Sequence, residues 1–77
     1  MTPKTLKLFT ALAADADNWG GETLLDGNVP IGPSEKGNLT DLKKQGLIQT
    51  YSEDGDTWCI FTEAGKQLAA ELGHPIH

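Results

Sequence analysis

Two stretches of the sequence decide the fold: GNLTDLKKQGLIQ at residues 37–49 and FTEAGKQL at residues 61–68. In the first, leucines recur at helical spacing, lysines occupy the final turn, where cations complement the helix dipole, and Gly46 follows as a helix-terminating residue. In the second, Thr62 is suited to cap a helix and Glu63 places an acid in its first turn. These patterns predict helices over residues 34–45 and 63–72.

The start of the first predicted helix has two candidate signals. Ser34 is a favourable capping residue, although Pro33 precedes it. Gly37 leaves two interpretations open, because it either permits close backbone packing or places the true start at Asn38, another good N-cap residue.

A β-hairpin is expected between the two helices. Residues 47–51 and 57–62 are rich in β-forming residues, and the polar run between them, residues 52–56, contains a glycine suited to a turn. Cys59 alternates with Phe61 along the second strand, so it is expected to face the core as a small apolar residue.

The first half of the chain predicts one helix followed by short extended segments. A capping threonine, a first-turn proline and apolar residues at helical spacing predict a helix that ends near residues 15–18. Glycine and proline dominate residues 20–33, within which residues 22–25 and 28–31 are expected to be extended. The predicted core collects the apolar residues that these spacings align: Leu6, Phe9, Leu12, Leu39, Leu42, Leu47, Phe61 and Leu68.

The two stretches resemble motifs of the MarR-type transcriptional regulators. In that family a recognition helix ends in a leucine, about two charged residues and Gly-Leu-Ile or Gly-Leu-Val, and the wing leads into Leu-Thr-Glu-x-Gly-Lys. LKKQGLI at residues 42–48 and FTEAGK at residues 61–66 match these motifs, and the resemblance covers about residues 38–72. It implies an α+β winged helix-turn-helix fold with three helices and a wing of two or three strands. A single domain over residues 1–73 and a flexible tail over residues 74–77 are expected.

The sequence departs from the family pattern at two places. Residues 26–33 contain two prolines and two glycines where the family has the first helix of its helix-turn-helix, so that helix is degenerate or replaced by a loop. The wing tip carries Glu53, Asp54 and Asp56 where the family has arginine or lysine for the minor groove.

The resemblance implies a small DNA-binding protein, a bacterial or phage transcriptional regulator, with residues 34–45 in the major groove. Its candidate DNA-binding residues are five side chains of that helix, of which all but Asn38 fall on one exposed face by their spacing: Lys36, Asn38, Thr40, Lys43 and Lys44. A solvated helix face is the alternative interpretation of these residues. A winged-helix adaptor that binds protein without DNA is the alternative function.

Composition limits the function further. The net charge is −5, and all six basic residues are lysines, which lowers the expectation of DNA binding because arginine is the main bidentate reader of guanine. No apolar run reaches the roughly 18 residues of a membrane span, and the single Cys59 forms neither an internal disulfide nor a zinc cluster, which fits a cytoplasmic protein. We find no nucleophile elbow, phosphate loop or paired carboxylates, so neither an enzyme nor a cofactor is expected.

Partners besides DNA are expected to use aromatic or helical surfaces. Trp19 and Trp58 are candidate interface residues, although packing is the favoured interpretation of both. A homodimer through the first helix, the last helix or these tryptophans is one expectation, and docking on another protein is the other. His74 and His77 are spaced for a metal, but a flexible tail is the favoured context.

Overall fold

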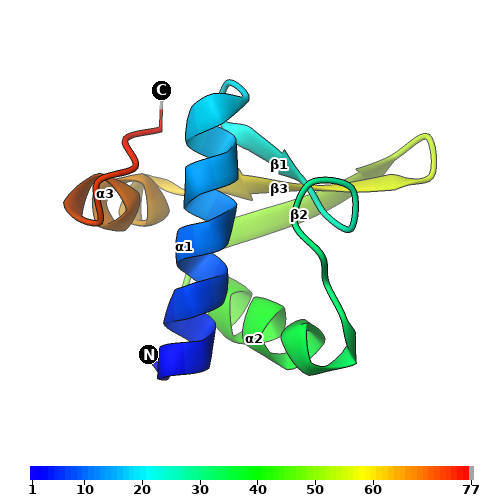
Figure 1. The fold of residues 1–77 in the computed structure, drawn as a ribbon, viewed down its shortest axis with the longest axis horizontal. Helices are drawn as coiled ribbons and strands as arrows, with labels where there is room; N and C mark the ends of the chain where they lie inside the picture. The colour runs from blue at the N-terminus through cyan, green and yellow to red at the C-terminus, as the bar shows by residue number, and fades with distance from the viewer. Residues whose placement is uncertain (77) are drawn as a thin grey trace.

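One antiparallel sheet organises the protein, and three helices pack around it. The computed structural model describes residues 1–76. The helices are α1 (Pro3–Asn18), α2 (Pro33–Lys44) and α3 (Glu63–Glu71), and the strands are β1 (Glu22–Leu24), β2 (Ile48–Glu53) and β3 (Asp56–Phe61). The strands lie in the order β1-β3-β2. In Figure 1, α1 crosses one face of the sheet, α2 lies below it, and α3 lies at the end of the strands opposite the β2–β3 turn. The protein is therefore an α+β domain, as predicted.

Helix α1 begins as its sequence predicts. The Thr2 hydroxyl accepts a hydrogen bond from the Thr5 amide at 3.2 Å, and Pro3 occupies the first turn. The prediction that Leu6 is buried is wrong, because Leu6 is 38% exposed. Thr5 takes the inward position instead, and its hydroxyl donates to Asn38 Oδ1 of α2 at 3.2 Å. Leu8 is buried on the same side of the helix as Thr5.

Helix α2 begins earlier than its capping residues indicate. Gly32 is the N-cap and Pro33 the first helical residue, so the predictions of a start at Ser34 or Asn38 are wrong. The reason is that proline has a backbone φ already suited to the first helical position. The predicted end is confirmed: the backbone reverses at Gly46, whose φ is +74°, and the Leu47 amide donates to the Leu42 carbonyl at 3.1 Å.

The predicted hairpin is confirmed. Ile48 pairs with Phe61 at one end of the β2–β3 ladder and Glu53 pairs with Asp56 at the other. The turn between them uses Asp54 and Gly55, both with positive φ, at 52° and 82°. Two consecutive positive φ values are the geometry of the tight turn that matches the twist of a hairpin.

The two diagnostic stretches of the sequence meet at the start of α3. Thr62 caps the helix by accepting from the Gly65 amide at 3.1 Å, as predicted. The same residue joins α3 to the end of α2, because its hydroxyl donates to the Gly46 carbonyl at 2.6 Å and its amide donates to the Leu47 carbonyl at 3.1 Å. Gly65 lies against Leu47 so closely that an added Cβ would be 2.0 Å from the Leu47 carbonyl oxygen.

The core lies between α1, the inner face of the sheet and the two other helices. Phe9 and Phe61 meet edge to face at its centre, with ring centroids 5.5 Å apart. Of the predicted core, Phe9, Leu12, Leu42 and Phe61 are buried, whereas Leu39, Leu47 and Leu68 are partly buried and pack against it. The buried core residues that the prediction omitted are Leu8, Ala13, Ala16, Leu25, Val29, Ile48, Ala69 and Ile76, and Cys59 is buried as expected.

The segment after α3 folds back along the domain. The His74 amide donates to the Ala69 carbonyl at 2.9 Å, and Ile76 is buried in the core cluster. His77, the last residue of the expected flexible tail, lies outside the described residues. The packing of Ile76 extends the folded domain beyond Gly73.

Candidate nucleic-acid interface

The exposed face of α2 carries four of the five candidate DNA-binding residues. Lys36, Thr40, Lys43 and Lys44 are all exposed to solvent. The Thr40 hydroxyl donates to the Lys36 carbonyl at 3.0 Å, so this short side chain lies down along the helix. The outermost atoms of the face are therefore the three lysine ammonium groups.

Asn38 lies apart from the other four. It is half-buried, its Oδ1 accepts from the Thr5 hydroxyl of α1, and its Nδ2 donates to the Ser34 carbonyl at 3.4 Å. Its side chain therefore joins α2 to α1 instead of pointing to solvent with the lysines.

Two further lysines, outside the five predicted DNA-binding residues, lie beside the start of α2. Lys4 and Lys7 of α1 line a surface groove together with Ser34, Glu35 and Asn38. The absence of acids from residues 1–14 is the one feature of the sequence that indicates a cationic segment here. The position of the two lysines next to α2 depends on the packing of two helices that are far apart in the chain, which local patterns do not reveal.

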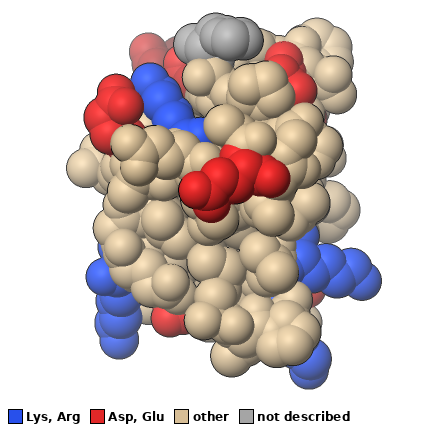
Figure 2. Space-filling view, turned by 90° about the vertical axis from the view of Figure 1, so that its left-hand side faces the viewer, with Lys and Arg blue, Asp and Glu red and all other residues tan. Residues whose placement is uncertain are grey.

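Charge is strongly segregated in this fold. Residues 1–14 and α2 together contain five lysines and two acids, a balance of +3, and the remaining residues contain one lysine and nine acids, a balance of −8. Figure 2 shows lysine side chains projecting from the lower end of the molecule, where α2 and the start of α1 lie. We call the five residues Lys4, Lys7, Lys36, Lys43 and Lys44 the lysine end. Although the net charge is −5, the protein therefore has one cationic end and is acidic elsewhere.

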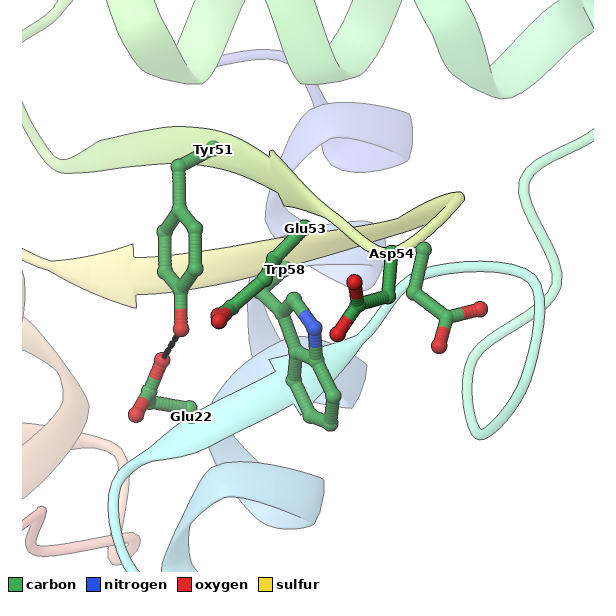
Figure 3. Close-up of a pocket in the computed structure, with 6 residues that line it drawn as sticks. Glu22, Tyr51, Glu53, Asp54 and Trp58 are labelled. Carbon is green, nitrogen blue, oxygen red and sulfur yellow. Dashed lines mark hydrogen bonds between the residues drawn. The ribbon is translucent and has the colours of Figure 1, made fainter.

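The outer face of the sheet has the opposite character. Tyr51 and Trp58 pair across β2 and β3 and line a shallow hollow of about 330 Å³ with Glu22 and the hairpin-tip acids. We call Glu53, Asp54 and Asp56 the acidic tip. Figure 3 shows the labelled side chains of the hollow on one side of the strands, with the faint α1 ribbon behind: Glu22, Tyr51, Glu53, Asp54 and Trp58. No lysine lines this hollow, so it is unsuited to phosphate.

Tyr51 and Glu22 are hydrogen-bonded on this outer face. The Tyr51 hydroxyl donates to a Glu22 carboxylate oxygen, which joins β2 to β1 across the intervening strand. This hydrogen bond, followed by desolvation and the negative charges of Glu22 and Glu53, raises the pKa of Tyr51 from 10.0 to about 12. The phenol therefore stays protonated well above neutral pH.

The two tryptophans have different environments. The packing prediction for Trp19 is wrong: it is the C-cap residue of α1 and is 70% exposed. The chain reverses directly after it through Gly20 and Gly21, both with positive φ, so the backbone turns back to the sheet and leaves the indole outside. Trp58 is half-buried and lines the hollow, whereas Trp19 does not line it.

The remaining reactive groups are the thiol of Cys59 and the side chains that could bind a metal. Cys59 is fully buried, and burial raises the pKa of its thiol from 9.0 to about 12 against a smaller opposite effect of Lys43. Within residues 1–76, no three histidine, cysteine or acidic side chains come together as metal ligands. No helix in the same range combines the length and the apolarity needed to cross a membrane.

Comparisons of the chain with family models, with curated proteins and with solved structures give no match. The surfaces of the protein are therefore the basis on which its function is inferred.

Proposed function

We propose that this chain is a small winged-helix DNA-binding protein, a bacterial or phage transcriptional regulator of the cytoplasm, that inserts α2 into the major groove. The observation that carries the proposal is the segregation of charge, with five of six lysines gathered on the start of α1 and on α2. A cationic end on an acidic protein attracts the phosphate backbone there and repels it elsewhere, which orients the protein on DNA.

The order of elements supports this proposal. Helix α2 is followed at once by the β2–β3 hairpin, and β1 pairs with β3 to complete the sheet, an arrangement compatible with a winged helix. A loop occupies the place of the first helix of a helix-turn-helix. It is closed by a hydrogen bond from the Ile31 amide to Asp26 Oδ1 at 2.7 Å, and Leu25 and Val29 are buried under it. This loop covers the core as a helix would, and it leaves α2 exposed.

The proposed affinity of one protomer is modest. Three α2 lysines and two α1 lysines supply at most five phosphate contacts, so binding at physiological salt is expected in the non-specific range of about 10⁻⁴–10⁻⁶ M. Tight operator binding then requires a homodimer, because two copies double the contacts and space two α2 helices one DNA turn apart.

A fluorescence anisotropy titration with a labelled duplex of about two helical turns tests the proposal. The logarithm of the binding constant should fall with the logarithm of salt concentration with a slope of about −3 if the three α2 lysines each neutralise a phosphate, and about −4.5 if the α1 lysines contribute. Replacing Lys36, Lys43 and Lys44 by glutamine should remove most of the binding. Lys66→Gln, a lysine of α3 outside the lysine end, is the matched control. No binding at low salt, or equal losses in the triple variant and the control, contradicts the proposal.

The uncovered sheet face favours a second candidate function, a winged-helix adaptor that binds another protein without DNA. Tyr51 is 39% exposed and stands beside half-buried Trp58, and four carboxylates surround the pair. Aromatic residues of this kind are enriched at protein interfaces. Sedimentation with and without DNA separates the two functions, because a strict monomer that does not bind DNA at low salt leaves the adaptor as the better account.

A further inference from the structure

Gly37 is an unexpected residue for its place in α2. It is the fifth of the twelve residues of the helix, it is exposed, and glycine is less favourable in a helix interior than any residue except proline. The structure offers no intramolecular reason for it. Gly37 is not among the glycines with positive φ, and a Cβ added to it would have no atom within 4 Å.

The other helical glycine makes the contrast clear. Gly65 in α3 is buried, and a Cβ there would lie 2.0 Å from the Leu47 carbonyl oxygen, so the fold itself excludes a side chain. Gly37 tolerates a side chain as far as the fold is concerned. A surface that approaches α2 from outside is therefore the remaining kind of contact that would require a bare backbone at this position.

Gly37 also lies at the centre of the exposed face of α2. Thr40 and Lys44 follow it at three and seven residues, so the three form one row along the helix, opposite the buried Leu42. Thr40 is short and its hydroxyl is turned to the Lys36 carbonyl. The middle of the face therefore carries no long side chain, whereas the long lysine side chains lie along its edge and at its C-terminal end.

We propose that Gly37 is the point of closest approach between α2 and a DNA duplex, where the missing side chain lets the helix backbone lie against the duplex surface. Cationic groups around a bare backbone suit a polyanion that must come close, because the lysines reach the flanking phosphates while the helix enters the groove. This inference rests on the proposed function, and it adds the residue that determines how deeply α2 enters the major groove.

Gly37→Ala tests the inference, since it changes shape and no charge. The variant should melt roughly 3–8 °C higher than the wild type, because alanine favours the helix and meets no neighbour. Its affinity for the labelled duplex should nevertheless fall roughly tenfold, the effect of one methyl group forced into a close contact. The salt slope should stay as in the wild type, because the number of neutralised phosphates is unchanged. Gln67→Ala, an exposed position of α3 where helix propensity also rises, should leave affinity unchanged.

The outcomes separate this inference from the proposed function. A Gly37→Ala variant that is more stable and binds the duplex as tightly as the wild type overturns the inference, while loss of binding in the lysine triple variant would still support the proposed function. A lower melting temperature for Gly37→Ala also overturns it, because Gly37 would then have a structural role. If the wild type fails to bind the duplex at low salt, both the inference and the proposed function are wrong.

Discussion

Gly65→Ala is the substitution whose effect follows most directly from the geometry of the fold. Helix propensity alone predicts a gain of up to about 1 kcal/mol, because alanine is the best helix former and Gly65 lies in the first turn of α3. The structure predicts the opposite sign. The new Cβ would lie 2.0 Å from the Leu47 carbonyl oxygen, whereas real contacts of this kind are essentially never below 3.0 Å, so α3 must withdraw by about 1 Å.

That withdrawal has a definite cost. Leu47 contributes a backbone oxygen, which cannot rotate away as a side chain would, and the same oxygen accepts from the Thr62 amide at 3.1 Å. Overpacking of this type costs about 1–3 kcal/mol, and more where the backbone has to move. Because the backbone has to move here, we expect a cost of about 2–3 kcal/mol, and subtracting the propensity gain of about 1 kcal/mol leaves a net loss of about 1–2 kcal/mol. In a domain of this size that loss lowers the melting temperature by about 4–16 °C.

Thermal unfolding followed by circular dichroism measures the effect. Gly37→Ala is the matched control, since it makes the same chemical change in a helix where the added methyl group meets nothing, and it should shift the melting temperature upward. If Gly65→Ala melts at or above the wild-type temperature, the contact between α3 and Leu47 is not as described, and the account of why FTEAGK has glycine at this position is wrong.

Further predictions concern the core, the outer sheet face and the acidic tip. Leu42→Ala should cost about 2–5 kcal/mol, because Leu42 is fully buried, and a urea melt that matches the wild type would refute the core assignment. Tyr51 is the only tyrosine, so tyrosinate absorbance reports it alone: its pKa should be about 12, and Glu22→Gln should lower it towards 10.0, which an unchanged titration would contradict. Because this pKa is raised by folding, the stability that the Tyr51–Glu22 hydrogen bond contributes should be present below pH 10 and lost as pH rises through about 12. Replacing the acidic tip by Ser, Asn and Asn should strengthen DNA binding at low salt, because three repulsive charges are removed, and unchanged affinity would mean that the hairpin never approaches DNA.

The elements themselves were predictable from the sequence because their signals are local. Gly46 after two lysines ends α2, Thr62 caps α3, and Asp54-Gly55 forms the hairpin turn, each through residues within a few positions of one another. The predicted start of α2 was wrong for a local reason as well. Pro33 is itself a helix-start signal, and it precedes the capping residues on which the prediction depended.

The features that sequence reasoning missed depend on tertiary packing. Whether Thr5 or Leu6 faces inward depends on where α2 crosses α1, because Thr5 is buried through its hydrogen bond to Asn38. The same crossing brings Lys4 and Lys7 to α2, so the lysine end was not visible from residues 34–45 alone. Trp19 is exposed because the backbone turns back to the sheet at Gly20 and Gly21, directly after α1.

The most direct measurement of the central claim is a map of backbone amide chemical shifts, recorded by NMR while a DNA duplex is added at low salt. The account predicts that the largest changes fall on the exposed face of α2, at Gly37, Thr40 and Lys44, and on the first turns of α1 around Lys4 and Lys7, and that they diminish as salt is raised. Changes centred on Tyr51 and Trp58 of the outer sheet face, or no changes at any ratio of DNA to protein, would contradict it.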